Sequence, residues 1–360
     1  MSGVLIRIEE PVGRITLNRP NALNALTLEM IRSIDEALVH WNDDPRVRSV
    51  LIEGAGDRGL CAGGDVRWLY ESARAKNGQA PSFFRAEYRM NARIAEYRKP
   101  VVALMDGIVM GGGIGISAHA SHRVVTERSG LAMPEVGIGF FPDVGATYLL
   151  STRSPGEIGT HIALSAAKLS AADALMASLA DYFIPTKRLA DIPGLLRDCV
   201  SAADITAALA AISTDAPASV LSEASGWINA CYAGGDVEAI LARLDGRPEE
   251  AAQRAAKEIR GMSPIALKQT LRTLRRAREI GALRPCLERE LILADQFMSV
   301  PDFVEGVRAA VIDKDRKPRW SPPHLNDVTP ELLDRYFPET SSVLPPVFGP
   351  LDRPTTEPQL

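Results

Sequence analysis

A glycine cluster directly after an apolar run most constrains how this chain can fold. Residues 101–104 are apolar and largely β-branched, and they follow Pro100. They are typical of a short buried strand, because proline favours an extended approach. The sequence GGGIG then occupies residues 111–115. Glycines between a strand and a helix let the backbone approach a ligand closely and leave N–H groups free to point at it.

Two carboxylates lie in the glycine-rich stretch that follows. Residues 133–145 have the sequence MPEVGIGFFPDVG, with Glu135 near the start and Asp143 near the end. The side chains around both are mostly apolar. Burial in such surroundings disfavours the charged form of a carboxylate, and enzymes prepare acids and bases in this way. We therefore interpret Glu135 as a desolvated acid or base and Asp143 as its partner.

The first half of the chain alternates strand and helix patterns. Residues 4–7 and 13–17 alternate apolar and polar side chains around Pro11, which predicts a β-hairpin. Thr27 is placed to cap a helix that runs to about Trp41. Glycine turns follow the strands at matching ends, which predicts α/β layering. The further expected elements are a strand over 47–52, helices from about 66 and over 83–97, and a strand over 123–126.

The second half is mostly helical from about Ser165. Residues 338–360 are rich in Pro, Ser and Thr without periodicity, which predicts a tail ordered only where it docks. We therefore expect a core domain over 1–190, a helical region over 191–337 and this tail. Glycine and proline punctuate the predicted helices, which cover 169–179, 191–211, 221–232, 251–260, 264–280 and 287–297.

Composition and charge narrow the function classes. The 360 residues carry a net charge of -4, which gives no reason to expect a nucleic-acid partner. The apolar run 101–118 is broken by Asp106 and by glycines, so it predicts a buried segment and no membrane span. The four cysteines are scattered and the first residues lack a leader pattern. Both observations favour reduced thiols and a cytoplasmic location.

Four motifs in a fixed order carry a resemblance to a known superfamily. They are ITLNRPNALNAL over 15–26, CAGGD over 61–65, DGIVMGGGIGI over 106–116 and AMPEVGIGFFPDVG over 132–145. In this order they resemble the crotonase, or enoyl-CoA hydratase/isomerase, superfamily. The later segment KDRKPRWSPPHLNDVT is similar to the end of a subfamily of CoA thioester hydrolases. The resemblance implies an α/β fold, a crotonase-like spiral of ββα units with a mostly helical C-terminal region.

The resemblance also implies a reaction. It is the hydrolysis of 3-hydroxyisobutyryl-CoA to 3-hydroxyisobutyrate and free CoA, a step of valine degradation. Hydrolysis builds negative charge on the thioester oxygen, and two backbone N–H donors aimed at that oxygen form an oxyanion hole. Carried over from the family, these donors are the N–H groups of Gly64 and Gly112. CoA is then part of the substrate, and no separate cofactor is expected.

The same resemblance implies catalytic or substrate-binding roles for three carboxylates. Glu135 matches the carboxylate that acts on the thioester carbon, either by direct attack that gives an enzyme anhydride or as a general base on water. Asp143 matches a second carboxylate that would orient the substrate 3-hydroxyl or assist departure of the CoA thiol. Glu87 matches a further position that contacts substrate. The structural alternatives are a loop cap for Glu135 and a solvated helix face for Glu87.

The residue at position 115 distinguishes this chain from the enoyl-CoA hydratases of the same superfamily. Enoyl-CoA hydratases use two glutamates, one aligned with Glu135 and the other where this chain has Gly115. An enoyl-CoA isomerase needs only the glutamate at 135 and stays open as an alternative, although Asp143 argues against it. A non-catalytic scaffold that binds acyl-CoA is the third possibility.

CoA is expected at two neighbouring stretches. In the family, backbone groups around the first motif and after the AGGD turn hold the adenine and the pantetheine. Arg67 lies just beyond that turn and would meet a phosphate, with an ordinary surface arginine as the equal alternative. The CoA-binding residues carried over are Ala22, Leu23, Ala25, Gly64, Asp65, Val66 and Arg67.

Other reactive side chains fit structural roles better. His119 and His122 have the i, i+3 spacing of helical metal ligands, but no third ligand is near, so we expect capping or packing and no metal. Cys61 has no histidine base in family position and is expected to be a packed small residue. The basic helix 264–280 is expected to present a solvated face, with CoA phosphates or a neighbouring subunit of a homo-oligomer as alternatives.

Overall fold

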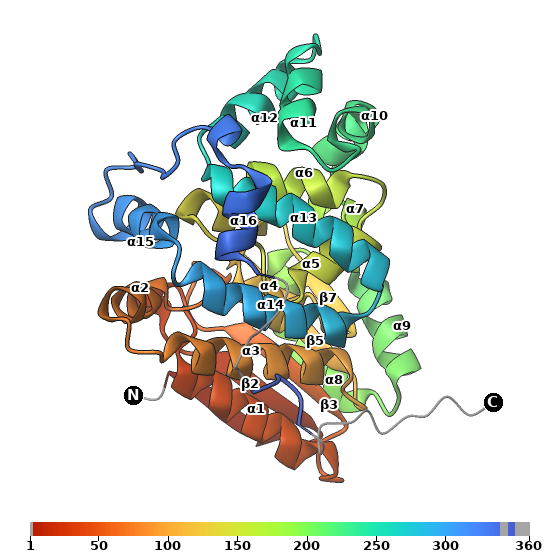
Figure 1. The fold of residues 1–360 in the computed structure, drawn as a ribbon. Coiled ribbons are helices and arrows are strands. Elements are labelled where there is room, and N and C mark those ends of the chain that lie inside the picture. Colours follow the sequence, from red (N-terminus) through yellow and green to blue (C-terminus); the bar gives the residue numbers. More distant parts are fainter. Residues whose placement is uncertain (1–2, 339–344, 350–360) are drawn as a thin grey trace, which may run out of the picture.

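The computed structural model describes residues 3–338 and 345–349, and two sheets lie at its centre (Figure 1). In the larger sheet β1 pairs antiparallel with β2, and the other pairings are parallel. Parallel neighbours need long crossover connections, which the helices supply. In spatial order this sheet contains β1 (Val4–Glu9), β2 (Val12–Leu17), β3 (Ser49–Gly54), β5 (Val101–Met105), β7 (His122–Val125) and β9 (Tyr182–Phe183).

The smaller sheet is parallel and has three short strands. Each follows a strand of the larger sheet along the chain, so that β3 leads to β4, β5 to β6 and β7 to β8. The chain therefore moves between the two sheets once in every unit before it enters a helix or turn. This confirms the predicted spiral of ββα units. The three short strands are β4 (Gly59–Cys61), β6 (Ile108–Met110) and β8 (Gly130–Ala132).

Local sequence patterns set where the helices begin. Thr27 Oγ1 accepts a hydrogen bond from Met30 N (3.2 Å) and caps α1, as predicted. Ser263 caps α13 in the same way, and Pro264 occupies its first turn. The α-helices are α1 (Leu28–Asn42), α2 (Val66–Ala75), α3 (Ala80–Ala95), α4 (Gly112–Ser117), α5 (Ala146–Tyr148), α6 (Ile158–Ser165), α7 (Ala171–Met176), α8 (Ile192–Asp198), α9 (Ala202–Ile212), α10 (Val220–Tyr232), α11 (Val237–Asp245), α12 (Glu250–Arg260), α13 (Pro264–Ile280), α14 (Leu283–Phe297), α15 (Pro301–Val307) and α16 (Pro330–Tyr336).

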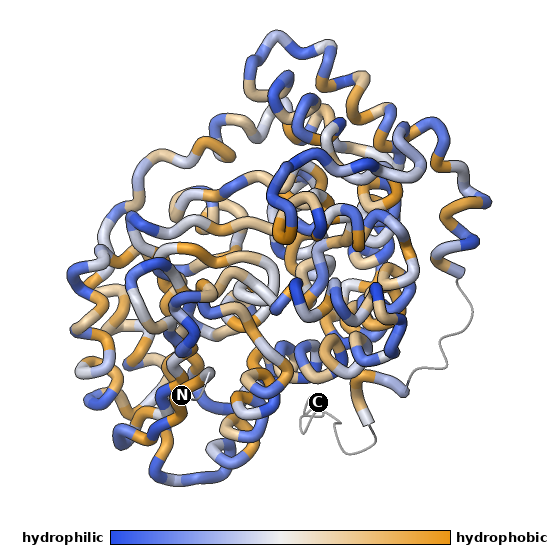
Figure 2. Tube along the Cα trace, turned by 90° about the vertical axis from the view of Figure 1, so that its left-hand side faces the viewer, coloured by the Kyte–Doolittle hydropathy of each residue, from blue (hydrophilic) through white to orange (hydrophobic). Residues whose placement is uncertain are grey.

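The larger sheet separates two apolar layers. On one face, Leu51 and Val102 of the sheet form a buried cluster with Ile192, Leu196 and Leu209 of α8 and α9. The main core lies on the other face. Hydrophilic residues gather along the outer helices of the chain trace (Figure 2). This two-layer burial holds the parallel strands, and therefore the turns at their ends, in fixed places.

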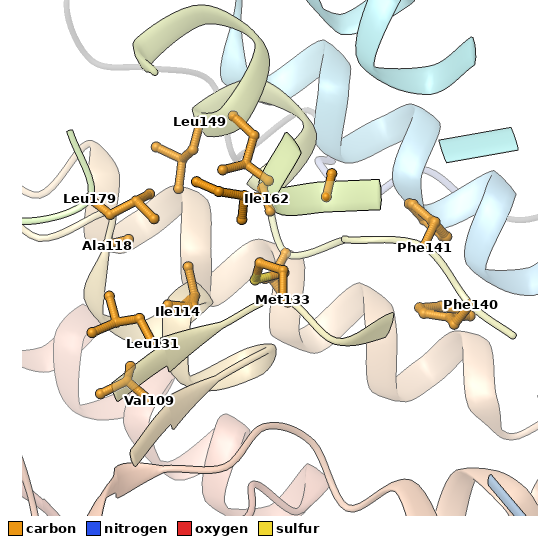
Figure 3. Close-up of a cluster of buried hydrophobic side chains, with 14 of the residues drawn as sticks. Val109, Ile114, Ala118, Leu131, Met133, Phe140, Phe141, Leu149, Ile162 and Leu179 are labelled. Atoms are coloured by element: carbon orange, nitrogen blue, oxygen red, sulfur yellow. The ribbon is translucent and has the colours of Figure 1, made fainter. Parts of the chain in front are cut away.

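The main core also supports the smaller sheet. Figure 3 shows Val109 of β6 and Leu131 of β8 side by side, with Ile114 of α4 close to Leu131. Further along, the rings of Phe140 and Phe141 lie 4.8 Å apart between centroids on the loop that leads to Asp143. The glycine turns and the carboxylate loop thus rest on continuous apolar packing.

The structure differs from the predicted helices in several places: α11 was not predicted, α7 is shorter than the helix predicted over 169–179, and two further differences concern 191–211 and the histidines. The helix predicted over 191–211 is two helices, because Ser201 and Asp204 form a capping box that starts α9 anew. The helical spacing inferred for two histidines was wrong. His119 follows the end of α4, and His122 begins β7.

Part of the predicted tail 338–360 lies against the body of the protein. Residues 339–344 and 350–360 are outside the described residues. Val347 is buried, its carbonyl accepts a hydrogen bond from Arg89 of α3 (3.1 Å), and its N–H donates to Glu288 of α14 (3.0 Å). The division into core domain and helical region stays a prediction. Across 3–338 and 345–349, no helix has the length and apolar character needed to cross a bilayer.

Candidate active site

Two backbone turns converge at the ends of the short strands. Gly64 follows β4, and Gly112 follows β6 at the start of α4. A Cβ atom built on Gly112 would lie 3.2 Å from the amide nitrogen of Gly64, so the two turns face each other closely. Neither N–H donates to another residue in the part of the chain that the structure describes. This is the arrangement an oxyanion hole needs.

Glu135 lies beside these turns, in the short 3-10 helix Glu135–Ile138 after β8. Its Oε1 is 2.8 Å from a Cβ built on Gly111, and its Oε2 is buried without a partner among the described residues. Burial, together with the charge of Asp143, raises the pKa of Glu135 well above its ordinary value. The oxygens of a loop-capping carboxylate would accept hydrogen bonds from the loop backbone. The unpartnered Oε2 of Glu135 therefore argues against a loop cap and favours a role in binding or catalysis.

Asp143 lies close enough to Glu135 for its charge to raise the pKa of that residue, and it accepts one strong hydrogen bond. The Tyr88 hydroxyl donates to its Oδ2 at 2.7 Å, and both side chains are buried. Burial raises the pKa of Asp143 to about 7, and the Tyr88 hydrogen bond opposes that rise. Tyr88 was not predicted from the sequence. It follows Glu87 directly on α3, and nothing in the chain order pairs it with a residue so far away.

Glu87 completes the group of carboxylates. It is buried on α3, and its Oε1 lies 2.5 Å from a Cβ built on Gly112, with no hydrogen-bond partner in the described chain. The solvated-face alternative is therefore wrong. Burial raises the pKa of Glu87 well above its ordinary value, and the charges of Asp143 and Glu135 raise it further. The structure brings Glu87, Glu135, Asp143, Gly64 and Gly112 to one place.

The expected CoA stretches meet at the same turn. Leu23 O accepts a hydrogen bond from Ala62 N (3.0 Å), and Arg19 joins Ala25 O (2.6 Å) to the carboxylate of Asp65 (3.2 Å). Ala22 is exposed, whereas Leu23 and Ala25 are half-buried. These bonds hold the first motif against the turn that carries Gly64.

The next residues open a helix. Asp65 caps α2 by accepting a hydrogen bond from Trp68 N (3.4 Å), and Val66 is its first residue. Arg67 is exposed, and its Nη2 donates to Val311 O at 2.9 Å. A phosphate contact of Arg67 stays a prediction, and that contact would have to compete with the Val311 carbonyl.

Cys61 and His119 are not organised as reactive groups. Burial raises the pKa of Cys61 to about 12, so the thiol is neutral and a poor nucleophile. Burial lowers the pKa of His119 to about 4, and its Nε2 lies 2.8 Å from Val144 O. Within the described residues, no group of three side chains is arranged to hold a metal ion.

The basic helix α13 lies outside this site. A cavity of about 580 Å³ between α11, α13, α14 and α16 contains several of its side chains and none of the carboxylates above. Its cations are largely neutralised by acidic neighbours. The ion pairs are Lys268–Glu238, Arg272–Asp334, Arg275–Glu157, Arg276–Glu279 and Arg278–Glu157.

Gly115 leaves no room for a second catalytic glutamate. A Cβ built there would lie 2.7 Å from Val144 Cβ and 3.0 Å from Asn91 Nδ2. Asn91 is fully buried, and its amide has no partner in the described chain. The space that a hydratase gives to a carboxylate is therefore filled from two other elements.

Gly115→Ala is expected to destabilise the protein by about 1–3 kcal/mol, because the added methyl group overpacks against Val144. Urea unfolding measures this loss. Gly194→Ala, in a helix where a Cβ meets nothing within 4 Å, is the control and is expected to unfold at or above the wild-type midpoint. Equal midpoints for both variants would show that position 115 has room after all.

Glu290 is a second residue that the sequence did not reveal. Its Oε2 accepts a hydrogen bond from Gly145 N (2.6 Å), and its Oε1 accepts bonds from the N–H and the hydroxyl of Thr147. Burial raises the pKa of Glu290 to about 8. It stands on α14, far along the chain from Gly145, and its neighbours in sequence carry no motif that would have marked it.

Comparisons with known proteins show what the chain as a whole is similar to. The model of a family described as enoyl-CoA hydratase/isomerase matches residues 12–337. The chain is 40% identical over 341 residues to "3-hydroxyisobutyryl-CoA hydrolase, mitochondrial" of Homo sapiens, covering 93% of this chain and 88% of the human protein. Two solved structures are also similar. A carnitinyl-CoA dehydratase from Mycobacterium thermoresistibile has a TM-score of 0.90 and 44% identity, and the match covers 97% of this chain and 99% of that chain. An enoyl-CoA hydratase from Rhodobacter sphaeroides has a TM-score of 0.85 and 42% identity, and the match covers 94% of this chain and 97% of that chain.

Proposed function

The chain belongs to the enoyl-CoA hydratase/isomerase family, and we propose that it hydrolyses 3-hydroxyisobutyryl-CoA to 3-hydroxyisobutyrate and free CoA. Several vertebrate relatives at about 40% identity carry the name of this hydrolase. One observation of the site carries the proposal. Glu135 lies beside the facing Gly64 and Gly112 turns with Asp143 close enough to raise its pKa, while position 115 is closed to a second glutamate.

The names of the two solved structures suggest a second candidate, addition or removal of water at a carbon–carbon double bond. In the family that chemistry uses a glutamate at position 115 together with Glu135. Val144 and Asn91 fill this position here. Asp143, in contrast, adds a buried carboxylate that neither hydration nor double-bond migration requires. The geometry therefore favours the hydrolase.

The proposed reaction begins with the thioester oxygen between the N–H groups of Gly64 and Gly112. These fixed donors stabilise the charge that develops on the oxygen as the carbonyl carbon is attacked. In one route Glu135 attacks the carbon directly, the C–S bond breaks with release of CoA as the thiol, and water then hydrolyses the enzyme anhydride. In the other route Glu135 takes a proton from the attacking water, after which the C–S bond breaks and CoA leaves as the thiol. The raised pKa of Glu135 brings its proton affinity closer to what a base at neutral pH requires. Asp143 would hold the 3-hydroxyl or aid the leaving thiol.

CoA enters this proposal as part of the substrate, bound at the two stretches that the resemblance assigns, residues 22–25 and 64–67, and no cofactor is invoked. A place in valine degradation follows from the proposed substrate. The cytoplasm stays the predicted compartment, although the vertebrate relatives are named mitochondrial. A homo-oligomer is compatible with the proposal and is not required by it.

The test is release of free thiol from a panel of acyl-CoA esters. We expect fast release from 3-hydroxyisobutyryl-CoA and 3-hydroxypropionyl-CoA, because both offer a 3-hydroxyl to Asp143. Acetyl-CoA and crotonyl-CoA are expected to be slower by at least about tenfold, the effect of one lost buried hydrogen bond to a charged group. Loss of crotonyl-CoA absorbance without thiol release would instead identify a hydratase.

A further inference from the structure

The loop that carries Asp143 has an unusual backbone. Val144 has a φ of 55° and Gly145 a φ of 79°. The left-handed region is unfavourable for a β-branched residue such as valine, so surrounding contacts must hold it there. Residues 143–147 are called the Asp143 turn below.

Glu290 holds the far side of this turn. Its carboxylate accepts hydrogen bonds from the backbone N–H groups of Gly145 (2.6 Å) and Thr147 (3.2 Å), and from the Thr147 hydroxyl. Glu290 and Thr147 are both buried. Three donors on one buried carboxylate define the position of the turn more closely than apolar packing would.

His119 holds the near side. Its Nε2 lies 2.8 Å from Val144 O, and since that oxygen only accepts, Nε2 carries the proton and donates. A Cβ built on Gly145 would lie 2.7 Å from the same Nε2, so the imidazole ring packs against the backbone of the turn. Val144 O and Gly145 N belong to one trans peptide and point in opposite directions, so the imidazole and the Glu290 carboxylate contact the turn from opposite sides.

We propose that Glu290 and His119 are positioning residues: together they clamp the Asp143 turn in its left-handed conformation and so set the carboxylate of Asp143 against the acyl chain. This inference rests on the proposed function. It explains why a buried carboxylate on α14 and an imidazole after α4 meet at one five-residue segment. It also assigns a task to two groups that the reaction itself does not use.

The chain offers a matched control on the same helix. Glu288 also accepts two backbone N–H groups, those of Val347 (3.0 Å) and Phe348 (3.1 Å), but it holds the C-terminal segment and not the Asp143 turn. Glu290→Gln and Glu288→Gln therefore remove the same kind of acceptor from α14. Only the first should affect Asp143.

The experiment is a double-mutant cycle with Asp143→Asn, read as thiol release from 3-hydroxypropionyl-CoA. Glu290→Gln is expected to lower kcat about 10- to 100-fold with little change in KM, since the CoA contacts lie elsewhere. In the Glu290→Gln background, adding Asp143→Asn should lower kcat by less than about a further threefold. In the Glu288→Gln background, Asp143→Asn should lower kcat by the same factor as it does in the wild type. Equal factors in both backgrounds would overturn the clamp.

Substitutions of His119 and hydrogen exchange of the Asp143 turn test the clamp in two further ways. His119→Gln, which keeps a donor for Val144 O, should recover most of the kcat that His119→Leu loses, and equal losses would contradict a donor role. Hydrogen exchange of the Asp143 turn needs no turnover. It should be at least about tenfold faster in Glu290→Gln than in Glu288→Gln. If the wild type released no thiol, the proposed function would fail while this exchange result still decided the clamp.

Discussion

Glu135→Gln is expected to lower thiol release by about 100- to 10,000-fold, the range over which a positioned base or nucleophile contributes. Glutamine keeps the size of the side chain but neither attacks a carbonyl carbon nor takes a proton. The loss should fall on kcat, because Glu135 acts on the thioester carbon and the CoA contacts lie elsewhere. Steady-state kinetics on 3-hydroxyisobutyryl-CoA measure the effect, with CoA affinity measured separately.

Glu127→Gln is the control for this substitution. Glu127 is exposed and accepts a hydrogen bond from Thr186 N at 2.9 Å, and its charge does not contribute to the raised pKa values of Glu87, Glu135 and Asp143. It should retain full activity. If Glu135→Gln hydrolysed the thioester within about threefold of the control, well short of the contribution of a general base, Glu135 would have no chemical role and the proposed reaction would need another nucleophile or base.

Gly112→Ala is expected to reduce kcat by about 100- to 1,000-fold, the usual effect of losing an oxyanion contact. The substitution keeps the backbone N–H of residue 112, and its φ is not in the region that requires glycine. The added methyl group, however, would lie 2.5 Å from Glu87 Oε1 and 3.2 Å from Gly64 N. It would therefore fill the space where the thioester oxygen meets its two donors.

A helical glycine elsewhere provides the comparison for that prediction. In α10, a Cβ on Gly226 would meet nothing within 4 Å, so Gly226→Ala should leave kcat unchanged and add helix stability. Circular dichroism and thermal unfolding would show that both variants are folded. Full activity in a folded Gly112→Ala would mean that the thioester does not bind between the two turns.

The fold could be predicted where local patterns decide the structure. The cap at Thr27 and the glycine turns after β4 and β6 depend on residues a few positions apart. The order of these elements then left few topologies, and the resemblance selected one. The break at Ser201 was missed because an apolar helical pattern continues on both sides of it, and only the capping box with Asp204 shows the interruption.

The site was predictable only in part, for a physical reason. Glu135, Asp143 and the two glycine turns lie in motifs, and each motif is read within one stretch of chain. Tyr88 and Glu290 act across the fold instead, through hydrogen bonds to Asp143 and to the backbone at Gly145. Contacts between distant segments depend on how α3 and α14 pack side by side (Figure 1), and no spacing in the sequence encodes that packing.

The filled space around Gly115 also bears on how one family can change its chemistry in evolution. A single substitution that introduced a glutamate at this position would meet Val144 and Asn91 before it met a substrate. The closer neighbour, Val144, would have to move or become smaller, and a smaller side chain there without the glutamate would leave a cavity in a packed region. Substitution at position 115 alone is therefore not enough to build the second carboxylate of a hydratase, because the glutamate would overpack the site unless its surroundings changed as well.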